Sequence, residues 1–392
     1  MISNQTETGS RYSDAEFFKE QLNLRFPGME EVAAAVAAED YPAARKAYAA
    51  YIRSHLQPER YFCIPYDGPG NCIVLEGESE QESADRICRN RLVSCGIPHD
   101  FGSTVDWYQN PTPNEYPEWT WQLSRHNEWK LLAHAYQQTG DERYAEKCAD
   151  FFTSWVRQAR YPGPMPKGWS ICWRTIECGI RMGINWPYAL HAFYKSPSFT
   201  DDLLVNWVKS VCEHGHLLHD QHKQGNWLIM EMNGLAQLSI IFPELTHARQ
   251  WLTFALELLE KELHRQLYPD GFQYELSTNY HKVVLSNYCQ LIRIARSYDM
   301  AMPESFLSVL EHASEVNLKL MQPNGRLPDL NDGSSSLAAD FIRPKMALFG
   351  HRTEFQWLVS DGKEGEKPDY ASIALPYSGI MIMRSSWQSD AV

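Results

Sequence analysis

The residues best suited to chemistry lie between Gly225 and His281, at the edges of two helical segments. Asn226 follows Gly225, and Tyr280 stands beside His281 after a polar loop that contains Glu275. An amide can neutralise a carboxylate by hydrogen bonding, while a phenol and an imidazole can remove one proton and return another to a leaving oxygen. β-Elimination in a uronic-acid polysaccharide needs those groups, because the C5 proton is abstracted beside the C6 carboxylate before the bond to O4 breaks. A polysaccharide lyase is therefore the first hypothesis.

Each of these residues also has a purely structural explanation. Asn226 precedes a helix predicted to begin at Leu228, so its side chain is equally suited to cap that helix. Tyr280 fits as an aromatic residue at a helix start. Adjacent residues on a regular helix point about 100° apart, so Tyr280 and His281 can face one cleft only at a helix terminus or in a loop. Glu275 is predicted to contact the substrate or to support residues that do.

A second group of candidates is rich in arginine and tryptophan. Arg174, Glu177 and Arg181 have i, i+3 and i+7 spacing, which places the three charged side chains on one face of a helix. An internal salt bridge and a subsite for an anionic sugar both fit that arrangement. Arg125 and His126 follow two tryptophans, whose rings are suited to stack on sugars. The predicted substrate-binding residues are Arg125, His126, Trp173, Arg174, Glu177, Arg181 and Glu275.

The charge of the chain limits its partners. A net charge of −13 over 392 residues argues against nucleic acid and against an anionic membrane surface. It also fits poorly with a sulfated polyanion, so local arginines would have to line a basic cleft. The expected partner is an acidic polysaccharide or oligosaccharide, and the sequence does not indicate an oligomeric state.

Cysteine usage and the N-terminus bear on the compartment. Nine cysteines without a CxxC pair predict reduced thiols and favour the cytoplasm. The polar residues 1–12 lack the features of a signal peptide, and no run of 18 apolar residues occurs. A periplasmic or secreted protein remains the alternative if a signal has been removed. Cys212, His216 and His219 share a helix face, but no second run of ligands accompanies them, so no metal site and no cofactor is predicted in this chain.

Helical periodicity dominates the pattern and predicts an all-α fold. Long helices with short links predict an incomplete (α/α) toroid of antiparallel hairpins over residues 13–370, after a disordered tail over 1–12. The 61–122 region, rich in Pro, Gly and Asn, is predicted to be irregular. A helix is predicted to start at Pro42. Further helices are predicted over 126–139, 142–161, 173–193, 201–222, 228–241, 247–267, 280–298 and 303–321.

The C-terminal end has a different pattern. Residues 378–387 predict a β-strand, and a single strand is not a domain. We favour the interpretation that residues 371–392 begin a β-sandwich domain that has been cut off. The alternative is a strand that docks on the toroid.

These blocks together resemble the heparinase II/III-like polysaccharide lyases, over roughly residues 30–390. That resemblance implies an N-terminal α/α toroid followed by an antiparallel β-sandwich. It rests on the order and spacing of several blocks: Ser124-Arg125-His126, Ala135-Tyr136 with Thr139-Gly140-Asp141, Trp173 to Arg181, Gly225-Asn226, Phe242-Pro243-Glu244, Pro269-Asp270-Gly271, Glu275 to Tyr280-His281, and Gly379 to Trp387.

The resemblance also implies residue roles. Asn226 would neutralise the carboxylate, Tyr280 would be the catalytic acid and base, and His281 would be a catalytic or substrate-contacting neighbour. Two departures matter. Ser124 stands where the family often has Asn, and the family takes a further catalytic His, and often a structural Zn or Ca site, from the β-domain. An isolated toroid is therefore expected to fold but to be weakly active or inactive.

Three other functions compete with the lyase. A toroid glycoside hydrolase needs two carboxylates, for which Asp270, Glu275, Asp329 and Asp332 are candidates. A uronyl C5-epimerase needs the same proton abstraction without loss of O4. A non-catalytic carbohydrate-binding toroid needs only the binding surface.

Overall fold

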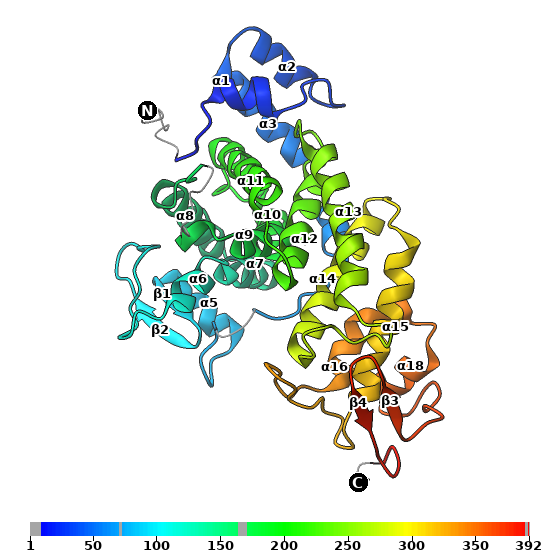
Figure 1. Ribbon diagram of the computed structural model, residues 1–392. Coiled ribbons are helices and arrows are strands. Elements are labelled where there is room, and N and C mark those ends of the chain that lie inside the picture. The colour runs from blue at the N-terminus through cyan, green and yellow to red at the C-terminus, as the bar shows by residue number, and fades with distance from the viewer. Residues whose placement is uncertain (1–8, 70–72, 164–170, 389–390, 392) are drawn as a thin grey trace. The chain divides into compact units, whose positions relative to one another are not determined.

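The computed structural model of the protein describes residues 9–69, 73–163, 171–388 and 391. Helices make up most of it, and the strands form two small hairpins (Figure 1). Two compact units can be separated within the described residues. The first comprises the chain up to Lys223 together with Met230–Ala255, and the second comprises Gln224–Ile229 and the chain from Leu256 onward.

The first unit contains the earlier helices and one hairpin. Its elements are α1 (Asp14–Glu16), the π-helix η1 (Phe17–Gln21), α2 (Glu30–Ala37), α3 (Tyr41–His55), α4 (Pro58–Tyr61), α5 (Glu80–Cys88), β1 (Arg91–Ser94), β2 (Ile97–Asp100), α6 (Pro117–Leu123), α7 (Asn127–Thr139), α8 (Arg143–Gln158), the 3-10 helix η2 (Ile171–Trp173), α9 (Thr175–Ile180), the π-helix η3 (Arg181–Asn185), α10 (Trp186–Phe193) and α11 (Asp201–Gln221). Among them α2 packs on α3, α7 on α8 and α10, and α11 on α3 and α9.

Two helices, α12 (Asn226–Ile241) and α13 (Ala248–Gln266), contribute residues to both units. The second unit continues with α14 (Thr278–Ser297), α15 (Glu304–Leu320), α16 (Ala338–Ile342), the 3-10 helix η4 (Arg343–Lys345), α17 (Met346–Phe349), α18 (Thr353–Val359), β3 (Ile373–Leu375) and β4 (Ile380–Ile382). Within this unit α14 packs on α15, and α15 packs on α16.

Local sequence signals explain where the long helices begin and end. The Asp40 side chain accepts a hydrogen bond from Ala43 N at 3.0 Å, and Pro42 occupies the first turn of α3. Gly140 ends α7 with φ of 69°, a left-handed conformation that glycine adopts without steric cost. Most of the helices predicted from Pro42 onward are confirmed to within a few residues at each end; the segment predicted over 173–193 is divided into η2, α9, η3 and α10.

The prediction of an irregular 61–122 region is wrong in part, because α5, α6 and the β1–β2 hairpin lie inside it. A capping box between Ser79 and Glu82 starts α5, and this spacing was readable from the sequence. Cys95 and Gly96 have φ of 51° and 74° at the hairpin turn, so both central residues are left-handed, as tight two-residue hairpins require.

The predicted disorder of residues 1–12 is wrong for residues 9–12, and residues 1–8 lie outside the described part of the chain. Ser10 Oγ donates to Glu213 Oε1 at 2.9 Å, and Lys209 Nζ donates to the Tyr12 carbonyl at 3.0 Å. Ser10 and Tyr12 are both buried. These polar contacts hold the short segment against α11, and no local sequence pattern predicts them.

The core of the first unit is unusually aromatic. Trp129 stacks on Trp186 with ring centroids 5.1 Å apart, and Phe152 stacks on Trp207 at 4.7 Å. All four rings are buried, and so are Trp107, Trp119, Trp155, Trp173 and Trp251, so most of the tryptophans fill the core rather than a sugar-binding surface.

The C-terminal strand is shorter than the predicted segment 378–387, and it pairs with a second strand. β4 pairs antiparallel with β3, with Ile373 opposite Ile382. Ser378, in the connecting turn, donates through its N–H and hydroxyl to the Asp270 carboxylate at 2.8 and 2.7 Å, which ties the hairpin to the rest of the second unit. That this hairpin begins a β-sandwich stays a prediction.

The helices can be judged by the length and apolar character that a membrane-spanning helix needs. In the described part of the chain, no helix is both long enough and apolar enough to span a bilayer.

Candidate active site

Asn226 and Glu275 form a direct contact in the second unit. Asn226 lies in the first turn of α12, and its Nδ2 donates to both Glu275 oxygens at 3.3 Å. Both side chains are half-buried. The carboxylate therefore orients the amide of the residue predicted to neutralise a substrate carboxylate.

The turn before Asn226 is fixed by a neighbouring glutamine. Gln266 Nε2 donates to the Gly225 carbonyl at 2.8 Å and to Glu262 Oε2 at 2.7 Å. Gly225 has φ of 73°, which favours glycine, and an added Cβ would meet Tyr274 Oη at 3.3 Å. The backbone that presents Asn226 is thereby held by residues 40 and more positions later in the sequence.

The loop that carries Glu275 is held in an unusual conformation. Leu276 has φ of 55°, a region that L-residues rarely adopt. Asn331 Nδ2 donates to the carbonyls of Glu275 and Leu276 at 3.0 and 3.1 Å, and Glu275 N donates to Gln273 Oε1 at 2.9 Å. Such backbone strain persists only where surrounding contacts impose it, and it is enriched at functional sites.

Tyr280 and His281 lie in the first turn of α14, which is capped by Ser277. Tyr280 is half-buried. His281 is only 1% exposed, its Nε2 faces the Ala313 carbonyl at 3.1 Å, and its ring meets Phe272 edge-on. Burial lowers the pKa of His281 to about 3, so the imidazole is neutral near pH 7. The two neighbours therefore have different surroundings, and a direct acid or base role for His281 has no geometric support.

Sequence reasoning missed Tyr274, Gln266 and Asn331. Burial and the adjacent Glu275 carboxylate raise the pKa of Tyr274, which is still 39% exposed. Only its position next to Glu275 could have drawn attention to Tyr274. Gln266 and Asn331 carry no local signal, because their role depends on contacts with distant backbone.

The predicted arginine subsite lies in the first unit, and its charges are partnered internally. Arg174 donates to Glu177 through Nε at 2.6 Å and Nη2 at 3.0 Å, and Arg125 Nη2 approaches the same carboxylate at 3.3 Å. Burial raises the pKa of Glu177, and both guanidinium groups oppose that shift. Arg174 also lies 3.8 Å from the Trp121 ring centroid. Arg174 and Glu177 are buried, whereas Arg125 keeps 22% of its side chain exposed and stays a candidate for substrate contact.

Arg181 does not share that carboxylate. Its guanidinium is fully buried and donates to the carbonyls of Ser124 and Cys172 at 2.6 and 2.9 Å and to His214 Nε2 at 3.1 Å. The i, i+7 argument fails because Arg174 precedes the first turn of α9 and Arg181 begins the π-helix η3. Direct substrate contact by Arg181 is therefore not supported.

His126 and Trp173 are likewise core residues of the first unit. His126 has φ of 60° at the start of α7, stacks on Trp129 and accepts from Trp186 Nε1 at 2.9 Å. Trp173 Nε1 donates to the Ala159 carbonyl at 2.7 Å. Both are essentially inaccessible, so direct contact of either side chain with a substrate is not supported.

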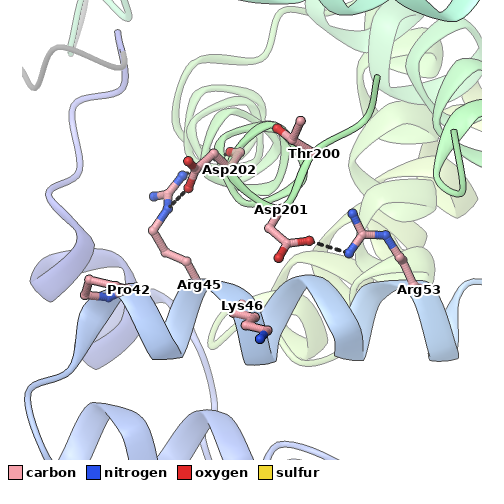
Figure 2. A pocket seen from close by; sticks show the side chains of 7 residues that line it. All are labelled: Pro42, Arg45, Lys46, Arg53, Thr200, Asp201 and Asp202. Atoms are coloured by element: carbon pink, nitrogen blue, oxygen red, sulfur yellow. Dashed lines mark hydrogen bonds and ion pairs between the residues drawn. The ribbon is translucent and has the colours of Figure 1, made fainter. Parts of the chain in front are cut away.

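A hollow between α3 and α11 gathers charges of both signs (Figure 2). Arg45 Nε pairs with Asp202 at 2.6 Å and Arg53 Nη1 with Asp201 at 2.5 Å. These ion pairs connect α3 with α11. Because both arginines of this hollow have a carboxylate partner, neither guanidinium is left unpaired for a ligand.

Within the described ranges, no group of three or more His, Cys, Asp or Glu side chains is arranged to hold a metal ion. The Cys212, His216 and His219 face therefore contributes no such group.

The family described as Heparinase II/III N-terminus matches residues 17–357. The chain belongs to this family. The heparin-sulfate lyase of Pedobacter heparinus is 26% identical over 385 residues, which are 95% of this chain and 57% of that protein. The heparin-sulfate lyase of Bacteroides stercoris is 25% identical, over 94% of this chain and 58% of that protein. The chain thus spans little more than half the length of these relatives.

Solved structures agree with the fold. The crystal structure of heparan sulfate lyase HepC from Pedobacter heparinus aligns with TM-score 0.75 at 25% identity, covering 97% of this chain and 60% of that one. A crystal structure of heparinase III aligns with TM-score 0.82 at 22% identity, covering 96% and 60%, and shows likeness of fold alone. The predicted fold class, all-α of the incomplete toroid kind, is confirmed.

Proposed function

We propose that this chain is the helical part of a polysaccharide lyase that cleaves a uronic-acid-containing glycosaminoglycan by β-elimination. Family membership supports the reaction class, and the named activity of the two heparin-sulfate lyases supports a sulfated substrate. The main support for the proposal is the hydrogen bonding between the Asn226 amide and Glu275, which lies on a strained loop held by several hydrogen bonds.

The proposed mechanism assigns the carboxylate to Asn226. An amide nitrogen carries two hydrogens, so one can be shared between the two Glu275 oxygens while the other donates to the C6 carboxylate of the sugar. The negative charge of Glu275 strengthens that orientation, since a hydrogen bond to an ionised acceptor is stronger than a neutral one. A pre-oriented donor stabilises the enolate that forms when the C5 proton leaves.

Tyr280 is proposed as the group that removes the C5 proton and returns one to O4. His281, buried and neutral, is proposed to position the first turn of α14 rather than to transfer protons. Asn226, Glu275 and Tyr280 all belong to the second unit. The cytoplasmic location and the metal expected in a β-domain stay predictions.

The test follows the near-ultraviolet absorbance of the new C4=C5 double bond, with this chain and with a version extended to the length of its relatives, on a panel of uronic-acid polysaccharides. Tyr280→Phe and Asn226→Ala should each lower kcat about 100-fold or more, the range for loss of an acid–base group or an oxyanion donor. Tyr377→Phe, at a tyrosine that is 65% exposed, is the matched control and should be silent.

Absence of an absorbance change with the extended protein on every polymer would reject elimination. Exchange of the C5 proton with solvent without cleavage would then indicate an epimerase. Sugar binding that survives Tyr280→Phe without turnover would indicate a binding toroid.

A further inference from the structure

A second hollow of the first unit gathers basic side chains around the C-terminus of α11. We call it the Arg11 pocket; it measures about 510 Å³ and is lined by Arg11, Tyr161, His216, Asp220, Gln221, His222 and Lys223. Its volume lies within the range of small-molecule sites and suits one or two sugar rings.

Arg11 is held rigidly at the wall of this pocket. Its guanidinium lies 4.5 Å from the ring centroids of both Tyr12 and Tyr161, and it donates to the Tyr12 hydroxyl. Its backbone N–H donates to Glu213 Oε1 at 2.8 Å, which docks the segment on α11. An arginine stacked between aromatic rings has lost its rotational freedom before any ligand arrives, which reduces the entropic cost of binding.

Glu213 is the carboxylate that acts on the charge of Arg11. Among the described residues, the buried Nε of Arg11 has no hydrogen-bond partner. Glu213 contacts the backbone of this segment, and burial raises the pKa of Glu213 to about 7, so that its negative charge is only partial near neutrality. A partly buried cation is suited to an anion, because an opposite charge offsets the cost of burying it.

The other walls of the pocket add little opposing charge. Asp220 is the acid of the lining, and its carboxylate is engaged by His219 Nδ1 at 2.7 Å. Burial, helped by Arg11, lowers the pKa of His216 to about 4, so that this ring is neutral and contacts Gln21. Lys223 is fixed through its backbone N–H, which donates to the buried Glu231 at 2.7 Å. The lining itself therefore contains two cations, Arg11 and Lys223, and one carboxylate, Asp220.

We propose that the Arg11 pocket binds the sulfate or carboxylate group of an acidic saccharide. A guanidinium is suited to the oxygens of either group through charge-assisted hydrogen bonds, and Tyr161 and Lys223 belong to the same lining. The choice of a saccharide rests on the proposed function, whereas the choice of an oxyanion rests on the pocket alone.

The experiment measures binding rather than turnover, so it does not depend on lyase activity. Titration calorimetry of the Tyr280→Phe protein would use a sulfated uronic-acid oligosaccharide, its unsulfated counterpart and sodium sulfate. Arg11→Gln should weaken binding of the preferred oligosaccharide about 10-fold or more, as expected for loss of a charge-assisted pair worth at least about 1.4 kcal/mol. Arg25→Gln, at an exposed arginine of the same unit, should leave affinity unchanged.

A second variant tests the pocket in case Arg11→Gln does not fold. His222→Asp adds a negative charge to the pocket without touching the tyrosine pair and should also weaken binding, with thermal unfolding checked for each variant. Preference for the sulfated or for the unsulfated oligosaccharide identifies the anion, and either supports the proposal. Unchanged affinity in both variants overturns it, as does binding of sulfate without binding of either oligosaccharide.

Discussion

Replacing Arg181 with Met should destabilise the protein without removing a substrate contact. The guanidinium is fully buried and donates to three N or O acceptors, the carbonyls of Ser124 and Cys172 and the Nε2 of His214, and to the sulfur of Cys178. Each buried acceptor that loses its donor costs about 1–3 kcal/mol. Methionine of similar volume relieves the cost of burying a cation, which offsets part of this loss. We therefore expect a net loss of about 4 kcal/mol.

The assay is thermal and denaturant unfolding, followed by lyase kinetics on the folded variant. For a unit of this size, 1 kcal/mol corresponds to about 2–4 °C, so the Tm of the first unit should fall by roughly 10 °C. KM should change little, since the side chain has no exposed surface. Arg25→Met, at an exposed position, is the matched control and should shift the Tm by about 1 °C or less.

One result would refute this reasoning. If Arg181→Met unfolds within about 2 °C of the native protein and raises KM about 10-fold or more, then Arg181 contacts the substrate in a conformation other than the one described. The anionic-sugar subsite that its sequence spacing suggested would then be restored.

Two further predictions concern packing and pH. Gly234→Ala places a Cβ 2.5 Å from the Gly179 carbonyl oxygen, so overpacking should exceed the helix-propensity gain of about 1 kcal/mol and lower the free energy of unfolding by roughly 2 kcal/mol. Gly183→Ala is the control and should cost less, because the nearest atom to its Cβ is 3.3 Å away. Equal losses for the two variants in denaturant unfolding would contradict this prediction. Burial raises the pKa of Glu244 from 4.5 to about 7 despite a hydrogen bond from Tyr48, so the folded state is penalised above about pH 7 and the penalty disappears as the pH falls toward 4.5. Glu244→Gln should therefore be more stable than the native protein above about pH 7, by up to about 3 kcal/mol, and lose that advantage toward pH 4.5; a pH-independent difference between the two unfolding curves would contradict the assignment.

The helices were predictable because their signals are local. The Asp40 cap, the Gly140 stop and the proline and glycine links lie within a few residues of the boundaries that they set, so a short window of sequence contains the cause. The same was true of the capping box at Ser79, which was present in the sequence but was overlooked in a region rich in turn residues.

The candidate site was predictable only in part. The sequence placed Asn226, Glu275 and Tyr280 in one candidate site, and their roles there stay predictions. What could not be predicted was the contact itself, because Asn226 and Glu275 are 49 residues apart and meet only when α12 and the loop before α14 are packed.

Sequence alone determined the residue types available for chemistry, the all-α class and most of the helix boundaries. Tertiary structure decided which of those residues are accessible. His281 and Arg181 read as reactive groups in the sequence, yet both are buried and bonded to backbone carbonyls from other segments. Helical periodicity specifies only a relative direction for each side chain, and whether that direction leads to solvent or to the core depends on distant segments that pack against it.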